Sequence, residues 1–239
     1  MYALEICNVT KKYKDITAVD SISLNAEKGK CLALLGVNGA GKTTTVKMIC
    51  GITRPDSGSI RVMGHDTVKE RGAVSSIIGV APQETAVAAN LTVRENLEFI
   101  AGIYGEKNAD IDSIVKKTGL ESVIKKRAGK LSGGYQRRLS IAMALISKPQ
   151  VLFLDEPTVG LDIIARREIL NLIESLKGDT TVILTTHYLE EAYKLSDTVA
   201  VMAHGKIRAY ATPEEIIKMS GKDSFEDAFI ALAGEEGEK

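Results

Sequence analysis

Apolar positions along the chain alternate between short continuous runs and longer amphipathic stretches. Buried parallel strands that are joined by crossover helices are typical of this pattern, so it predicts an α/β fold. The early strands are separated by turns rather than helices, which predicts a small antiparallel sheet beside the parallel one. The predicted strands are Leu4–Val9, Ser21–Asn25, Cys31–Leu35, Ser59–Val62, Ile77–Val80, Val151–Leu154, Thr181–Thr185, Thr198–Met202 and Lys206–Tyr210.

Between Pro82 and Pro149 the strand pattern stops and helix signals replace it. Thr92-Val93-Arg94-Glu95 has the form of a capping box, and Ser132-Gly133-Gly134 is a second helix start. We therefore expect one domain over residues 1–239, with a core of residues 1–82 and 150–211, an inserted helical subdomain of residues 83–149 and a C-terminal extension of residues 212–239.

The C-terminal extension predicts two short helices after Pro213, followed by the acidic end GEEGEK. Phe225, Phe229 and Leu232 would share one stripe of the second helix. His204-Gly205 separates the last two strands and predicts a hairpin turn. His65 and His204 have no chemical context in the sequence, and we interpret both as surface turn residues.

Composition excludes some classes of function. Lys plus Arg and Asp plus Glu each total 31 of the 239 residues, so the net charge is zero and argues against a nucleic-acid partner. No apolar run is long enough to cross a bilayer, and the N-terminus lacks a signal-peptide core, so we expect a chain that is neither secreted nor membrane-spanning. Cys7, Cys31 and Cys50 have apolar neighbours, and we interpret them as core residues in a reducing compartment.

A glycine-rich segment marks a phosphate site. Residues 36–43, GVNGAGKT, satisfy G-x-x-x-x-G-K-[ST] between a buried strand and a predicted helix. Glycines let successive backbone amides converge on phosphate oxygens, Lys42 adds a positive charge, and the Thr43 hydroxyl suits Mg²⁺. A glycine-rich turn without a ligand would give no reason for Lys-Thr to follow. The nucleotide-binding residues predicted here are Gly36, Asn38, Gly39, Ala40, Gly41, Lys42, Thr43 and Thr44.

Two adjacent acids end the buried strand Val151–Leu154. Buried acids are costly without a cation, and neighbouring strand residues face opposite sides, so Asp155 and Glu156 should have different tasks. We assign Asp155 to Mg²⁺ and Glu156 to the attacking water. One acid alone would be ordinary for a strand end that meets solvent. Two acids together with the phosphate loop predict hydrolysis of a nucleoside triphosphate.

Ser132, Gly133 and Gly134 open a helix with free backbone amides and form a second candidate phosphate site. For an isolated Ser-Gly-Gly, a plain helix cap would be the favoured interpretation. Together with the other motifs, this segment resembles the ATP-binding cassette (ABC) family, specifically the nucleotide-binding subunit of a transporter, and the resemblance covers nearly the whole chain. The departure is Tyr135, where the family's commonest signature, LSGGQ, has Gln; in this chain Gln136 follows it.

The resemblance implies a P-loop NTPase core of the RecA type and roles for single residues. Tyr13 would stack on adenine, Gln83 would act in catalysis and on Mg²⁺, and His187 would be the switch histidine in catalysis. Ser132, Gly133 and Gly134 would bind the ATP of a second subunit, and Asp162 would belong to the D-loop beside it. From the residues alone, Tyr13 is more often a strand or turn aromatic, and Gln83 would be ordinary in a loop. His187 could hydrogen-bond a neighbouring loop, although its place at the sheet end favours a phosphate contact. Asp162 could also cap a helix, which is compatible with the D-loop role.

Two such subunits would pair head to tail, as a homodimer or heterodimer, enclose ATP with Mg²⁺, and drive transmembrane permease subunits from the cytoplasmic face of the cell membrane. The segment from Ser224 to Leu232 is similar to the ending of drug- and sodium-exporter ATPases, which favours export. Its simpler interpretation is a helix that packs on its own domain. The alternatives are a soluble ABC-type ATPase with a non-membrane partner and a non-hydrolysing regulatory module. A P-loop kinase or GTPase is disfavoured because there is no NKxD and the LSGG segment would have no purpose.

Overall fold

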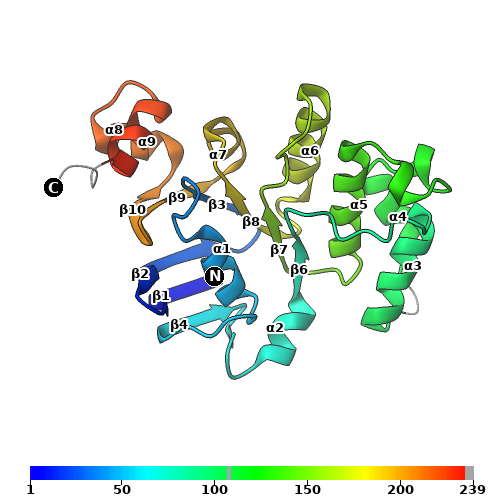
Figure 1. Ribbon diagram of the computed structural model, residues 1–239, viewed down its shortest axis with the longest axis horizontal. Coiled ribbons are helices and arrows are strands. Elements are labelled where there is room, and N and C mark those ends of the chain that lie inside the picture. Colours follow the sequence, from blue (N-terminus) through cyan, green and yellow to red (C-terminus); the bar gives the residue numbers. More distant parts are fainter. Residues whose placement is uncertain (107–108, 235–239) are drawn as a thin grey trace.

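Two β-sheets form the centre of the computed structural model, which describes residues 1–106 and 109–234 (Figure 1). The strands are β1 (Tyr2–Tyr13), β2 (Ile16–Glu27), β3 (Cys31–Leu35), β4 (Ser57–Val62), β5 (His65–Asp66), β6 (Ile78–Ala81), β7 (Val151–Asp155), β8 (Thr181–Thr186), β9 (Thr198–Ala203) and β10 (Lys206–Ala211). The larger sheet has the order β10-β9-β3-β8-β7-β6 and is parallel except for β10. The smaller sheet, β2-β1-β4-β5, is antiparallel.

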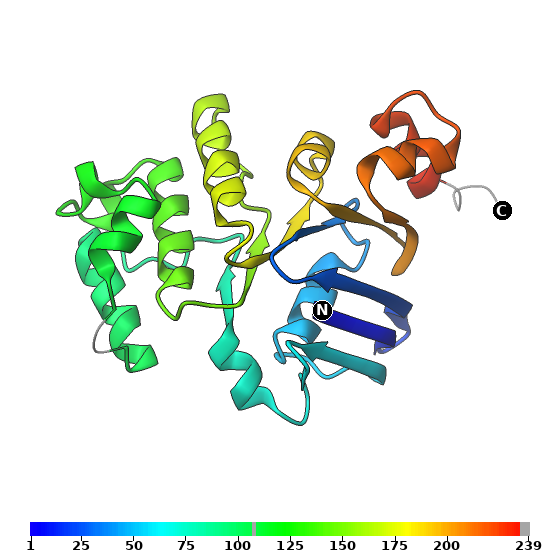
Figure 2. The same ribbon diagram turned by 180° about the vertical axis from the view of Figure 1, so that it is seen from behind.

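Helices cover the larger sheet and extend the molecule at both ends. They are α1 (Lys42–Ile49), α2 (Arg71–Ile77), α3 (Val93–Tyr104), α4 (Ile111–Lys117), α5 (Gly133–Leu145), α6 (Ile163–Leu176), α7 (Leu189–Leu195), α8 (Pro213–Ser220) and α9 (Phe225–Gly234), with 3₁₀ turns at Glu121–Val123 and Ala128–Lys130. Helices α3, α4 and α5 lie at one end of the long axis, and α8 and α9 lie at the other (Figure 1, Figure 2). Among the described residues, no helix is long and apolar enough to cross a membrane.

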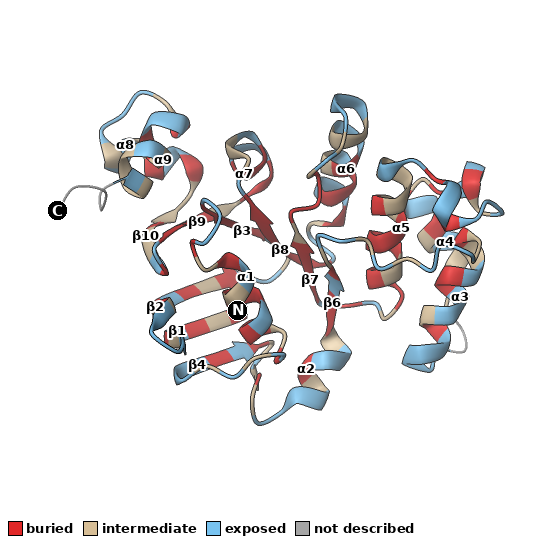
Figure 3. Cartoon of the chain, in the orientation of Figure 1, coloured by how far each residue is buried: buried red, intermediate tan, exposed pale blue. Residues whose placement is uncertain are grey.

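The buried side chains form distinct cores that fix these parts to the larger sheet (Figure 3). One core joins the two sheets around α1, where Met48 and Ile49 are fully buried. A second joins the opposite face of the larger sheet to α5 and α6. The inserted helices have a core of their own, and α7, α8 and α9 pack on β3 and β9. The parallel strands are therefore covered on both faces, as their continuous apolar sequences require.

The α/β architecture, with a small antiparallel sheet and a helical insertion, confirms the predicted fold class. Each predicted strand is present, several of them longer than expected. Helix α2 and the two-residue β5 were not predicted, and Ile77 ends α2 instead of beginning a strand. Helix α2 gives no periodic signal because Val74 alone is buried among its residues, and Gly72 and two serines lower its helix propensity. His65 lies in β5 and pairs with Val62, so its assignment to a turn was wrong.

Local capping confirms the predicted helix starts. Thr92 and Glu95 form a reciprocal capping box at α3, and Ser132 is the N-cap residue of α5. Two helices follow Thr212 as predicted, and Phe225, Phe229 and Leu232 pack on the core beneath α9, which supports the simpler interpretation of that segment. In the acidic end GEEGEK, residues 235–239 lie outside the described residues.

The three cysteines occupy different environments, so the prediction that all are core residues was wrong for one of them. Cys7 faces solvent because it alternates with the buried Ile6 along β1. Cys31 is buried in β3, and Cys50 is partly buried after α1. Burial raises the pKa of each of these two thiols to about 12. Both should remain protonated and unreactive in the folded protein.

We expect a thiol reagent to label the folded chain at Cys7 alone at mildly alkaline pH. The thiolate is the reactive species, and Cys31 and Cys50 are both shielded and protonated. Peptide mass spectrometry after brief labelling would measure the extent at each site. A Cys7→Ser variant should take up almost no reagent until it is unfolded in guanidinium. Rapid labelling of Cys31 in the folded Cys7→Ser variant would contradict the packing of β3.

Candidate active site

The loop between β3 and α1 has a backbone that tolerates no side chain at two positions. Gly41, the N-cap residue of α1, has φ of 102°, and a Cβ there would lie 2.5 Å from the carbonyl oxygen of Ala18. A Cβ on Gly36 would lie 2.4 Å from the carbonyl oxygen of Met202. The loop is therefore pressed against β2 at Gly41 and against β9 at Gly36, so both positions require glycine.

A cavity of about 770 Å³ opens over this loop. The predicted site residues that line it are Asn38, Gly39, Ala40, Gly41, Lys42, Thr43, Thr44, Gln83 and Glu156. Ile16, Thr17, Ala18, His204 and Gly205 complete the lining. The His204-Gly205 turn is tied to the phosphate loop, because the Gly205 amide donates to the Ala40 carbonyl at 3.2 Å. The predicted hairpin is present, but His204 also forms part of the cavity wall.

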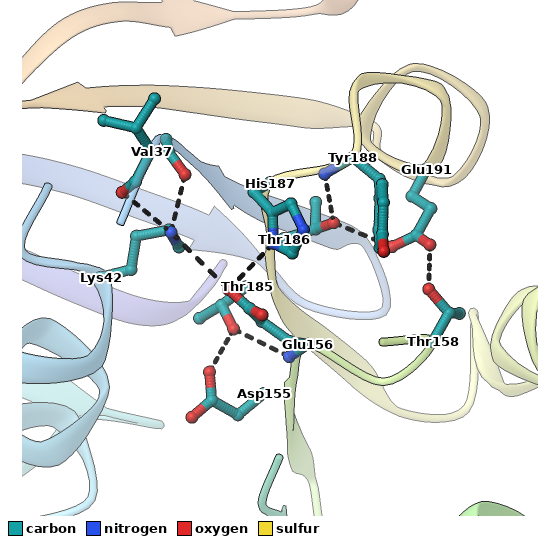
Figure 4. Close-up of polar contacts among 11 residues, drawn as sticks. Val37, Lys42, Asp155, Glu156, Thr158, Thr185, Thr186, His187, Tyr188 and Glu191 are labelled. Atoms are coloured by element: carbon teal, nitrogen blue, oxygen red, sulfur yellow. Dashed lines mark hydrogen bonds and ion pairs between the residues drawn. The ribbon is translucent and has the colours of Figure 1, made fainter. Parts of the chain in front are cut away.

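Lys42 lines this cavity, and its side chain is only 6% exposed. It donates hydrogen bonds to the carbonyl oxygens of Gly36 at 2.7 Å and Val37 at 3.2 Å (Figure 4). Burial lowers the pKa of Lys42 below its usual value, whereas the carboxylates of Glu156 and Asp155 act in the opposite direction. The cation is thus held by the loop and faces the acids at the end of β7.

Glu156 connects the cation to the histidine that follows β8. Its Oε1 lies 3.8 Å from Lys42 Nζ and 3.2 Å from His187 Nδ1 (Figure 4). The backbone of Glu156 has φ of 46°, a left-handed conformation that costs about 1–3 kcal/mol. Its amide donates to the carbonyl and hydroxyl oxygens of Thr185, each at 3.1 Å, which holds this conformation in place. The strained backbone turns the carboxylate toward His187.

Asp155 is oriented by a separate contact, since the Thr185 hydroxyl donates to its Oδ1. The pairing of β7 with β8 places Asp155 directly opposite Thr185. The two adjacent acids therefore make different contacts, Asp155 with the Thr185 hydroxyl and Glu156 with Lys42 and His187.

The start of α5 lines a different cavity from the one over the phosphate loop. Gly133 lines a second cavity, of about 390 Å³, together with Gln83, Arg137 and Leu161. Ser132 is exposed, and its side chain makes no capping bond to the helix. Asp162 caps α6, since its Oδ1 accepts hydrogen bonds from the amides of Ile164 and Ala165 at 2.9 Å each. One copy of the chain therefore does not bring residues 132–134 to the cavity that Lys42 lines.

Comparison with known proteins assigns this arrangement to a family. Residues 19–159 match the ABC transporter family. The daunorubicin resistance ATP-binding protein DrrA3 of Streptomyces coeruleorubidus is 39% identical over 240 residues, covering 98% of this chain and 76% of that protein. The Nod factor export ATP-binding protein I of Rhizobium etli is 39% identical over 222 residues, covering 91% of this chain and 70% of that protein.

The chain belongs to the ABC transporter family. Its fold is similar to that of a dimeric ATP-binding cassette in a post-hydrolysis state bound to ADP and Pi, with a TM-score of 0.77 and 26% identity over 87% of this chain and 98% of that chain. These comparisons confirm the ATP-binding subunit that the motifs predicted, and its activity as an ATPase.

Two aromatic residues of this ABC ATPase are not in the lining of the cavity over the phosphate loop, although Tyr13 pairs with Ile16, which is. Tyr13 is 46% exposed at the end of β1, where it pairs with Ile16, and its ring centroid lies 5.4 Å from Lys11 Nζ. Tyr135 packs against the core of the inserted helices, and its hydroxyl lies 3.4 Å from that of Ser122. The departure from LSGGQ thus places an aromatic inside the helical subdomain. Its neighbour Gln136 donates instead to the carbonyl oxygens of Ala128 and Leu131.

Sequence reasoning about this ABC ATPase missed several residues that hold the site together. The buried Arg137 donates to the carbonyl oxygens of Pro82 at 2.7 Å and Gln83 at 2.6 Å. Burial lowers the pKa of Arg137. Thr185 orients both acids, and Glu191 is buried beside the His187 segment. A charged residue inside an apolar helix face was the available signal for Arg137. The partners of Arg137 and Thr185 are remote in sequence, as is the Thr158 partner of Glu191.

We expect Arg137→Lys to loosen the segment that carries Gln83. A single ammonium lacks the fork that reaches both carbonyls, and the lost bonds should lower the free energy of unfolding by about 1–3 kcal/mol. Urea unfolding would measure the stability, and hydrogen exchange would report the protection of the backbone amides of residues 83–86. Arg167→Lys, an exposed change on α6, should alter neither. Unchanged exchange in Arg137→Lys would contradict the anchoring role.

Proposed function

We propose that this ABC ATPase pairs head to tail with a second cassette, encloses ATP and Mg²⁺ between the two, and uses closure and hydrolysis to power export through separate membrane subunits. The observation that carries this proposal is the separation of the two candidate phosphate sites. Lys42 lines one cavity, whereas Ser132 and Gly133 are exposed near another. A second copy would supply the missing half of each ATP site.

In this proposal the phosphate loop binds ATP through its backbone amides and Lys42, and Tyr13 provides a face for the base. The oxygen donors Thr43, Gln83 and Asp155 suit Mg²⁺, which usually takes one or two protein ligands together with phosphate and water. The Thr185 hydroxyl already orients the carboxylate of Asp155, as expected for a metal ligand. Bound Mg²⁺ would neutralise charge on the phosphate oxygens.

Glu156 is the group that we assign to the attacking water. Its side chain is 11% exposed, and Oε1 is within hydrogen-bonding distance of His187 Nδ1. A positioned carboxylate can accept a proton from water as the water attacks the terminal phosphate. His187 would hold this carboxylate in place from the end of β8. Lys42 would meanwhile stabilise charge on the phosphate from the other side of the cavity.

Closure of the pair follows from contacts that differ between states. ATP would be held by the loop of one copy and by Ser132, Gly133 and Gly134 of the other, with Asp162 beside it. Hydrolysis would split ATP into ADP and phosphate, so one ligand would no longer join the two copies. The closed state would therefore lose stability. The dimeric post-hydrolysis cassette of similar fold supports this arrangement.

Mixing two inactive variants tests the proposed pair. Lys42→Ala should weaken ATP binding, and Ser132→Arg should abolish turnover while the separate chain still binds ATP. In a head-to-tail pair, a mixed dimer has one site with both changes and one intact site. Turnover should therefore rise well above that of either variant alone.

Phosphate release by separate and mixed samples would measure this effect. Ser113→Arg, an exposed change on α4, should be active without mixing. No rise on mixing, with mixed dimers demonstrated by two affinity tags, would contradict the shared site.

Exposed apolar side chains on α3 support a membrane-subunit partner. Phe99, Ile103 and Tyr104 are 57%, 64% and 47% exposed, although the opposite side of α3 is buried. Helix α3, which carries them, lies at the end of the molecule remote from α8 and α9 (Figure 1, Figure 2). Exposed apolar groups gathered on one helix mark interaction sites. We assign this surface and the Gln83 segment to docking, which would hold the chain on the cytoplasmic face of the membrane.

Export is favoured by the names of similar proteins, one for daunorubicin resistance and one for Nod factor export. A transported solute would meet the membrane subunits, whereas this chain would supply the motion. The balance of 31 basic and 31 acidic residues supports a protein partner over nucleic acid.

We expect a Phe99→Ser, Ile103→Ser double variant to lose membrane association while it keeps its ATPase activity in solution. The change removes exposed apolar area on α3 and leaves the nucleotide cavity untouched. Sedimentation of the tagged chain with membranes of the cells that encode it would measure the association. Met219→Ser removes an apolar side chain that is 71% exposed on α8 at the opposite end, and this variant should remain bound. Normal sedimentation of the double variant would refute this docking surface.

A further inference from the structure

Glu191 in α7 is an acid that the proposed reaction does not use, yet its side chain is only 1% exposed. Its two carboxylate oxygens have separate hydroxyl donors. The Thr158 hydroxyl donates to Oε1, and the Thr186 hydroxyl donates to Oε2 at 2.8 Å (Figure 4). Arg166 Nε lies 3.6 Å from Oε1. One buried group therefore joins three separate parts of the chain.

Two of these parts carry the proposed catalytic residues. Thr158 is two residues beyond Glu156, in the loop after β7, and Thr186 immediately precedes His187. The Thr186 oxygen also accepts a hydrogen bond from the Tyr188 amide at 2.9 Å, which turns the chain at His187. Glu191 thus contacts both the segment that carries Glu156 and the segment that carries His187.

Ring contacts connect Arg166 to His187 through the side chain of Tyr188. The Arg166 guanidinium lies 4.1 Å from the centroid of the Tyr188 ring, and that ring lies 4.3 Å from the imidazole of His187. Arg166 is attached to α6, which begins immediately after Asp162. The same carboxylate therefore bears on the orientation of the imidazole and on the start of the helix that Asp162 caps.

The stability of the fold alone does not explain why a carboxylate is buried at position 191. A buried carboxylate is costly, and burial raises the pKa of Glu191 despite the two hydroxyl donors. Apolar groups of similar shape often serve stability as well as a buried ion pair does. What an apolar group cannot do is fix two loops through two directed hydrogen bonds. The neighbouring acid Glu190 is exposed and forms an ion pair with Lys194, so it provides a comparison on the same helix.

We propose that Glu191 is a positioning residue, which fixes residues 156–158 against residues 186–188 so that His187 stays within hydrogen-bonding distance of Glu156. This inference rests on the roles proposed above for Glu156 and His187. Loss of Glu191 should reduce the rate of hydrolysis and leave the binding of ATP nearly unchanged, because Glu191 does not line the nucleotide cavity.

The test compares Glu191→Leu, Glu191→Gln and Glu190→Gln in the full chain. We expect Glu191→Leu to lower kcat for ATP about tenfold or more, with KM within about twofold of the original chain. Glu191→Gln should recover part of the loss, since its amide can still meet both hydroxyls. Glu190→Gln should match the original chain. A wild-type kcat in Glu191→Leu would overturn the proposal.

Two further measurements separate positioning from a merely structural role. The chain has three histidines, so proton NMR can follow each imidazole. In Glu191→Leu the His187 resonance should shift while those of His65 and His204 stay in place. Parallel losses of kcat, affinity for a non-hydrolysable ATP analogue and melting temperature, with an unshifted His187 resonance, would overturn the proposal.

Thr158→Val tests one of the two hydrogen bonds without touching the charge. It should lower kcat less than Glu191→Leu does, and the double variant should be no slower than Glu191→Leu alone. Additive losses would overturn the shared role.

Glu156→Gln separates this inference from the proposed function. If Glu156→Gln keeps the wild-type rate, the assignment of Glu156 is wrong; if it is inactive while Glu191→Leu is normal, only the positioning role falls.

Discussion

Negative charge at the carboxyl edge of the parallel sheet is the constraint on which the site depends. Strands β7 and β8 pair up to their carboxyl ends. Asp155 and Glu156 stand at the end of β7, and the segment that leads to Glu191 follows β8. Carboxylates at this depth are costly unless hydroxyls and cations meet them. Lys42 and Arg166 approach from α1 and α6, and threonine hydroxyls donate to Asp155 Oδ1 and to both carboxylate oxygens of Glu191. Lys42, which belongs to the phosphate loop, thus also helps to stabilise the fold at this edge.

Much of the fold and site could be predicted because the signals are local. The phosphate loop needs contiguous glycines, and the strand that precedes the two acids is a continuous apolar run. The capping boxes at α3 and α8 likewise lie within four residues. Helix α2 could not be found in this way, since one buried residue gives no stripe. Cys7 was misassigned because its apolar neighbours conceal the alternation of β1.

Remote contacts explain the remaining failures. Arg137 meets carbonyl groups 54 and 55 residues away, and the Thr158 partner of Glu191 is 33 residues away. An acid in the first turn of a helix is ordinary, so Glu191 carried no signal in the sequence. His204 was placed correctly in a hairpin turn, but only the packing of that turn on the phosphate loop brings it to the cavity.

The guanidinium of Arg137 ties helix α5 to the segment that follows β6. Its two nitrogen atoms hold the carbonyls of Pro82 and Gln83, and the helix that bears it begins at the exposed Gly133. A tilt of α5 would therefore move the carbonyl groups of Pro82 and Gln83 with it, and Gln83 lines both the cavity over the phosphate loop and the cavity beside Gly133.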